Sequence, residues 1–151
     1  MRMSAAGNSL SKRGFTLVEL LVVIAIIAMA SAGVSFAIRD SSQTVLEREA
    51  ERLAALLESG RAQSRTNGVA IRWRALEQGF RFEGSVPGTL PDNWMSGDIV
   101  VPAQSSLLLG PEPIIGPQRL VLRVASQPQT ALMVATDGVR PFSVQALPVS
   151  P

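Results

Sequence analysis

A run of mostly apolar residues at 15–38 constrains this 151-residue chain more than any other feature. At a helical rise of about 1.5 Å per residue it would extend roughly 36 Å, which is enough to cross a hydrocarbon core of about 30 Å. The preceding segment, 1–14, is polar and ends in Lys12-Arg13-Gly14. Basic residues on that flank place it in the cytoplasm. The sequence therefore predicts a single-pass membrane helix with the rest of the chain on the far side of the membrane.

The helix is expected to continue through 39–67 with an amphipathic pattern, and to stop at Asn67-Gly68. Gly33 and Gly60 are the expected bends within it. Apolar residues recur three and four positions apart and form one stripe: Leu46, Ala50, Leu53 and Leu57. We interpret this stripe as a packing surface. Charged residues are assigned to the opposite, exposed surface: Glu47, Arg48, Glu49, Glu51, Arg52 and Glu58.

After Gly68 the apolar pattern changes to a period of two, which is typical of half-buried strands. A first strand is expected within 69–74, and its antiparallel partner at 80–82 after a turn at 77–79. Residues 84–98 are rich in Gly, Pro, Asp and Asn and predict a loop, with Trp94 holding it against the core. Further short strands are expected at 99–101, 120–124, 132–136 and 142–147, with a tight turn at Asp137-Gly138.

These segments predict an α+β fold, in which a long N-terminal helix packs against a small antiparallel β-sheet head. The expected organisation is a leader at 1–14, a membrane helix at 15–38, an amphipathic helix at 39–67 and a β-rich head at 68–151. The interrupted strands offer too little apolar surface for a core of their own. The head is therefore expected to pack on the helical stripe.

Composition argues against ordinary enzyme chemistry. The chain has no Cys, no His and no Tyr, which removes thiol nucleophiles, Cys/His zinc sites and His-based acid–base catalysis. No phosphate-binding loop is found, and the aspartates match no calcium-loop spacing. We expect no catalytic residue, no cofactor and no metal. A membrane-anchored enzyme with paired carboxylates is the alternative, since such pairs form in space and leave no spacing in the sequence.

The positive charge of the chain belongs to its N-terminal end. From Arg39 onward the sequence holds 11 basic and 11 acidic side chains. A neutral body lacks the basic footprint of a nucleic-acid-binding protein. The sequence therefore argues against a nucleic-acid partner.

Residues 12–21 read Lys-Arg-Gly-Phe-Thr-Leu-Val-Glu-Leu-Leu and strongly resemble a type IV prepilin signal. The resemblance implies that a prepilin peptidase cleaves between Gly14 and Phe15, and that the new N-terminal Phe15 is methylated. Gly14 suits this role because it has no side chain to obstruct a protease. Glu19 is the unusual residue, since a carboxylate costs a few kcal/mol at the centre of a bilayer. In pilin-like filaments the resemblance implies that this glutamate pairs with the N-terminal ammonium of an adjacent subunit during assembly.

Two simpler interpretations stand beside this one. A basic flank and an apolar run also describe a secretory signal peptide, with Ala28-Met29-Ala30 as its cleavage site. Glu19 and the length of the apolar segment argue against it. Glu19 could also pair with the amine of its own chain, about 6 Å away along the axis, and with the helix dipole.

Residues 46–58, 68–73 and 79–82 are similar to the GspH/FimT group, and more specifically to the H-type minor pseudopilin of type II secretion systems. The resemblance covers 15–83; beyond that it extends only to the strand pattern and the turn at Asp137-Gly138. It implies a subunit of a periplasmic pseudopilus that helps export folded proteins across the outer membrane. The implied partners are other minor and major pseudopilins, the prepilin peptidase, the inner-membrane assembly platform and inner-membrane lipid.

The alternative within the same resemblance is a minor pilin of a type IV pilus, of the FimT kind, which in some systems binds DNA. DNA binding would require a basic patch, often late in the chain. After Arg123 the only basic residue is Arg140.

Overall fold

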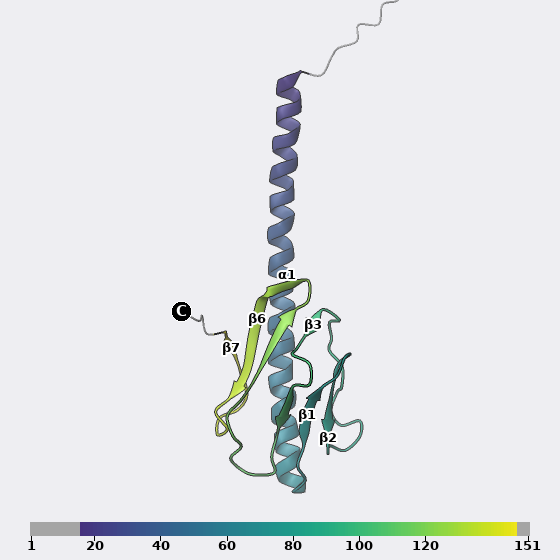
Figure 1. The fold of residues 1–151 in the computed structure, drawn as a ribbon, viewed down its shortest axis with the longest axis vertical. Coiled ribbons are helices and arrows are strands. Elements are labelled where there is room, and N and C mark those ends of the chain that lie inside the picture. Colours follow the sequence, from purple (N-terminus) through teal and green to yellow (C-terminus); the bar gives the residue numbers. More distant parts are fainter. Residues whose placement is uncertain (1–15, 148–151) are drawn as a thin grey trace, which may run out of the picture. The chain divides into compact units, whose positions relative to one another are not determined.

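The computed structural model describes the backbone of residues 16–147 and the side chains of residues 16–31 and 41–147. It contains one long helix, α1 (Leu17–Asn67), followed by short strands that pair only in antiparallel fashion (Figure 1). The α+β class predicted from the sequence is confirmed. The chain divides into two compact units, Met1–Ile38 and Arg39–Pro151, and the second holds every described strand.

The strands form two sheets, where the sequence predicted one. The first has the order β2-β1-β4, with β1 at Arg72–Ala75, β2 at Phe80–Glu83 and β4 at Ser106–Leu108. The second has the order β3-β5-β6-β7. Its strands are β3 (Ile99–Val100), β5 (Gln118–Val124), β6 (Gln127–Thr136) and β7 (Ser143–Ala146).

Most of these strands lie where the alternating pattern predicts them. The pairing of β1 with β2 is confirmed, with Trp73 opposite Phe82 and Ala75 opposite Phe80. The first strand begins at Arg72 and not at 69. The backbone carbonyl of Val69 bonds a side chain of the helix and not a neighbouring strand, because it accepts a hydrogen bond from the Ser64 hydroxyl at 2.6 Å.

The alternating pattern does not predict strand β4, because its leucines are consecutive and do not alternate with polar residues. It pairs with β1, and its inner residue Leu107 lies opposite Trp73. The side-chain amide of Gln118 extends the ladder beyond it. Gln118 Nε2 donates to the Leu108 carbonyl at 2.8 Å, and its Oε1 accepts from the Leu108 N–H at 2.7 Å. The Gln118 side chain thus provides an acceptor for the N–H and a donor for the carbonyl of Leu108. These two bonds join the edge of the first sheet to the start of β5.

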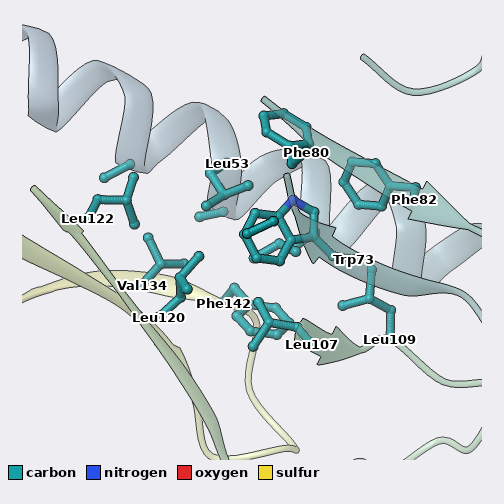
Figure 2. Packing of buried hydrophobic residues seen from close by; sticks show 14 of the residues in the cluster. Leu53, Trp73, Phe80, Phe82, Leu107, Leu109, Leu120, Leu122, Val134 and Phe142 are labelled. Carbon is teal, nitrogen blue, oxygen red and sulfur yellow. The ribbon is translucent and has the colours of Figure 1, made fainter. Parts of the chain in front are cut away.

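The core of the second unit lies between the helical stripe and the inner faces of the two sheets. Leu46, Ala50, Leu53 and Leu57 are buried to within 1% exposure, so their predicted packing role is confirmed. Leu53 belongs to one buried cluster with residues of both sheets and with Phe142, which precedes β7 (Figure 2). The strand residues of this cluster include Trp73, Phe80, Phe82, Leu107, Leu120, Leu122 and Val134.

The aromatic rings of this core confirm the position predicted for Trp94. Its ring meets Phe80 edge-on, with the two ring centroids 4.7 Å apart, and Phe80 in turn contacts Trp73 at 5.8 Å. Edge-on pairs of this kind add about 0.5–1.5 kcal/mol to the burial of the rings. Trp94 therefore attaches the loop 84–98 to the core.

Two glycines mark the helix in different ways. Gly68, with a φ of +66°, follows Asn67 and confirms the predicted stop, because this conformation ends a helix and favours glycine. At Gly60 the helix continues without interruption, and the residue has a packing role instead of the predicted bend. A Cβ there would lie 2.8 Å from Leu109 Cδ1 and 3.3 Å from the Phe82 ring.

The predicted assignment of the charged helix residues to the exposed surface is wrong for Glu49, since only 3% of this residue is exposed. Its Oε1 accepts hydrogen bonds from the backbone N–H groups of Met95, at 2.5 Å, and Ser96, at 3.0 Å. Arg52 lies 3.4 Å from the other carboxylate oxygen and donates to the Asn93 carbonyl at 3.0 Å. Glu49 is buried because its carboxylate satisfies the backbone of a loop that has no strand partner there.

Arg61 is the second buried charge, 2% exposed, and it binds three backbone carbonyls that are distant in sequence. Its guanidinium donates to Gly138 at 2.6 Å, Arg140 at 3.2 Å and Pro113 at 3.4 Å. Glu58, one turn earlier, lies 3.4 Å from it and accepts the Phe142 N–H at 2.9 Å. This fork fastens two loops to the helix.

We expect Arg61→Met to destabilise the second unit by about 3–5 kcal/mol, because it leaves buried carbonyls and a carboxylate without their donor. The loss of stability for Arg61→Lys should be smaller than that for Arg61→Met but still measurable, since an ammonium keeps the charge and cannot reproduce the planar fork. The measurement is urea unfolding of the full chain in detergent. Arg48→Met is the control, an exposed arginine of the same helix. An equal loss of stability in both methionine variants would contradict this role of Arg61.

The turn after β6 provides a pH-dependent element. The backbone N–H groups of Arg140 and Val139 donate to Asp137 Oδ1 at 2.7 and 2.9 Å, and they lower the pKa of Asp137 below its ordinary value of 3.8. Because the folded pKa lies below the unfolded one, this contribution to stability is complete above 3.8 and is lost as the pH falls through the folded pKa.

We therefore expect the Asp137 carboxyl group to titrate below 3.8 when it is followed by NMR in the folded chain. Asp137→Asn keeps an oxygen acceptor for both N–H groups and removes the titration. This variant should show a flatter dependence of stability on pH below about pH 4 than the natural chain does. A midpoint at or above 3.8 would show that the two N–H groups do not stabilise the carboxylate in solution.

Candidate functional site

The predicted assembly residue Glu19 lies in the first turn of α1, which begins at Leu17. Its backbone N–H donates to the Thr16 hydroxyl oxygen at 3.2 Å. Thr16 is thus the residue that caps the helix, and Glu19 occupies the third helical position. A Thr followed three residues later by Glu is the sequence signature of a capping box, so this arrangement could have been recognised from the sequence.

This position favours a negative charge for a local reason. The first turn of a helix carries unpaired N–H groups and a partial positive charge, and an acidic side chain there contributes about 0.3–1 kcal/mol. The local effect explains how the helix tolerates Glu19. The carboxylate of Glu19 nevertheless stays accessible to a partner, because its side chain is exposed in the described structure.

Glu19 lies among exposed apolar side chains. Between 16 and 31 it is the only ionisable residue. The large apolar side chains before and after it, on every side of the helix, are 40–78% exposed. They are Leu17, Val18, Leu20, Leu21, Val22, Val23, Ile24, Ile26, Ile27 and Met29. A helix that is apolar all round is stable only when lipid or protein covers it, and a carboxylate covered in this way needs a cationic partner.

The other polar group of this segment is satisfied within the helix. The Ser31 hydroxyl donates to the Ile27 carbonyl at 2.8 Å, one turn earlier. A hydroxyl bound in this way adds little to the cost of covering the helix with apolar groups. Glu19 is therefore the residue of this segment whose side chain would need a partner from elsewhere if apolar groups covered the helix.

The two residues of the predicted cleavage site, Gly14 and Phe15, lie outside the described residues. So does the predicted partner of Glu19 within its own chain, the amine that cleavage would create. Within residues 16–31 and 41–147, no helix is both long enough and apolar enough to span a membrane.

The aspartates of the second unit that follow α1 lie on loops. In the part of the chain that the structure describes, no three Asp, Glu, His or Cys residues gather where a metal ion could bind. Asp98 accepts a hydrogen bond from Ser126 at 2.5 Å, and Asp137 is bound by its own turn. Each of these aspartates is thus engaged by a local polar group.

An open groove of about 550 Å³ lies beside Trp94. Its walls combine one aromatic ring with small and amide side chains, and Glu77 is its one titratable lining residue. The groove lining comprises Glu77, Gln78, Gly79, Asn93, Trp94 and Ser96, with Gly97 and Ile99.

Comparison with known proteins bears on the N-terminal segment. A family model described as the prokaryotic N-terminal methylation motif matches residues 9–35. No curated protein and no solved structure was found to be similar to this chain. The matched segment contains Gly14, Phe15 and Glu19, and none of the strands. The match supports a type IV pilin-like protein.

Proposed function

We propose that this chain is a minor pseudopilin of a type II secretion system, a structural subunit of the periplasmic pseudopilus that helps export folded proteins across the outer membrane. It acts by assembly and carries out no catalysis. The observation that carries the proposal is one exposed carboxylate, Glu19, in the first turn of an otherwise apolar helix within the matched methylation motif.

The proposed processing follows from this placement. A prepilin peptidase cuts after Gly14 and methylates the amine of Phe15, which leaves a cationic terminus just before the helix. During assembly Glu19 pairs with the terminal ammonium of an adjacent subunit. The pair neutralises two charges that apolar surroundings would otherwise penalise, and it fixes the axial stagger between neighbouring subunits.

The proposed location is the bacterial inner membrane, with 15–38 as a single-pass anchor, the leader in the cytoplasm and the head in the periplasm. The basic flank at Lys12-Arg13 supports this orientation. The exposed apolar surface of the helix from Leu17 to Met29 supports an environment of lipid before assembly and of other pilin-like helices afterwards. Partners are therefore other major and minor pseudopilins and the assembly platform.

The H-type assignment within the GspH/FimT group is the finer part of the proposal. It rests on the resemblance of the acidic-and-arginine helix and of the first two strands, the segment that ends in Gly-Phe-Arg-Phe at 79–82. A FimT-like minor pilin that binds DNA is the competing assignment. A DNA retardation assay at low salt separates the two, since clear binding favours the pilus protein. Neighbouring genes for a secretion ATPase and a secretin would favour the pseudopilin.

We expect Glu19→Ala, Glu19→Leu and Glu19→Lys to reduce incorporation into the filament by about tenfold or more, because each leaves a subunit's ammonium without its partner. The head should remain folded, since Glu19 belongs to the first unit and the core of the second unit is built from residues after 45. The measurement is co-purification with the major pseudopilin, together with secretion of an exoprotein.

Two controls separate assembly from helix capping. Glu51→Gln removes an exposed carboxylate of the same helix and should leave incorporation unchanged. Thr16→Val removes the hydroxyl that caps the first turn but keeps the Glu19 charge. If Thr16→Val reduced incorporation as strongly as Glu19→Ala, the role of Glu19 would be capping alone.

We also expect Gly14→Leu to block cleavage, because a branched side chain next to the scissile bond obstructs the protease. The cell should then accumulate a precursor that is heavier by the 14 leader residues and carries no N-terminal methyl group. Intact-mass analysis of the purified protein measures both. Gly7→Leu, at a glycine elsewhere in the same leader, is the matched control and should be processed normally. Normal processing of Gly14→Leu would place the cleavage site elsewhere.

A further inference from the structure

Charge is distributed unevenly over the second unit. Its strands carry five arginines and a single acidic residue, Glu83, and every one of these six side chains is exposed. The helix from 41 to 67 holds equal numbers of both signs, and the described loops are predominantly acidic. A head that is neutral in total therefore presents basic strand faces to its surroundings. The strand arginines are Arg72, Arg74, Arg81, Arg119 and Arg123.

Three of these arginines share the outward face of the sheet β2-β1-β4. Trp73, Phe80 and Phe82 alternate with them and point into the core (Figure 2). We name the outward surface formed by Arg72, Arg74 and Arg81 the arginine face.

The pairing register brings two of these charges directly together. Arg74 lies opposite Arg81, and Arg72 lies opposite Glu83. Like charges directly across two strands destabilise a sheet. A neutral polar residue in place of Arg81 would avoid this repulsion.

The single glutamate of this face does not neutralise it. Glu83 binds Arg74, with Oε1 and Nε 3.1 Å apart, and both side chains are nearly half exposed, at 44% and 48%. Such a pair contributes little to stability. Among the described residues, Arg72 and Arg81 have no hydrogen-bonding or ionic partner, so two guanidinium groups remain available to a ligand.

The neighbouring strand adds an apolar contact to this charged surface. Arg72 pairs with Leu108, whose side chain is 39% exposed, and Arg74 pairs with Ser106. The side-chain amide of Gln118 hydrogen-bonds both backbone groups of Leu108 at this edge of the sheet. Arginine is enriched at surfaces that bind proteins.

We propose that the arginine face binds an acidic segment of a partner protein, through carboxylates that accept from the unpaired guanidinium groups of Arg72 and Arg81. A guanidinium fork matches the two oxygens of a carboxylate and binds it in a bidentate manner. The dimensions favour this occupant over nucleic acid. Adjacent strands are about 4.8 Å apart and alternate residues about 6.8 Å apart, which is too short a track for the 6–10 phosphate contacts of a typical DNA-binding surface.

This inference goes beyond the proposed assembly function and does not depend on Glu19. It concerns the second unit, and it would hold for a pseudopilin and for a pilus subunit alike.

The test measures binding of a short fluorescein-labelled polyglutamate peptide to the purified full chain in nonionic detergent, by fluorescence anisotropy at low salt. The double variant Arg72→Gln/Arg81→Gln should raise the Kd for the peptide by about tenfold or more, because it removes both unpaired forks. The double variant Arg48→Gln/Arg140→Gln removes the same charge from exposed sites elsewhere and should change the Kd by less than about twofold.

A separate measurement distinguishes loss of binding from loss of the fold. Arg81→Gln removes the like-charge pair, so its thermal unfolding midpoint should equal or exceed that of the natural chain. The proposal is overturned if the peptide does not bind, or if both double variants weaken binding equally. Tighter binding of a single-stranded DNA oligonucleotide of the same charge would also overturn it, and would favour a nucleic-acid surface instead.

Discussion

The second unit depends on the burial of one helical stripe. Seven short strands divided between two sheets cannot enclose a core by themselves, and Leu46, Leu53 and Leu57 supply the surface on which both sheets pack. Each such side chain contributes about 1.5–3 kcal/mol when it leaves water. Because the sheets share this stripe, the two remain next to each other although no backbone ladder connects them. Gln118 supplies that missing link with a side-chain amide.

Three charged residues of α1 illustrate how surroundings decide what a charge does. Glu49 is buried and binds loop N–H groups, and Arg61 is buried and binds loop carbonyls, so both are structural. Glu19 is exposed among apolar side chains, and its carboxylate has no hydrogen-bonding or ionic partner among the residues whose side chains the structure describes. A buried charge that is fully satisfied explains the fold around it. An exposed charge that apolar groups surround points to a partner from outside the chain, and for this reason Glu19 carries the proposed function.

The strand arginines extend this reasoning to a surface. A charge that neither the fold nor its neighbours require, such as Arg81 opposite Arg74, has no structural explanation within the chain. The methylation motif at 9–35 covers the N-terminal part of the chain and gives no information about the head. The proposed assembly residue and the proposed binding surface therefore belong to different units, and the two proposals can be tested separately.

The sequence by itself determined the long helix, its stop at Gly68, the alternating strands and the candidate residues Gly14, Phe15 and Glu19, because these are local patterns of period and composition. It also contained the Thr16–Glu19 capping signature, which could have been read there. Only the tertiary structure decided that Glu49 and Arg61 are buried, that Ser106–Leu108 forms a strand and that there are two sheets. The physical reason is that each of these depends on groups remote in sequence. The carbonyls that bind Arg61 lie about 50 to 80 residues away, and no periodicity of a helix can encode them.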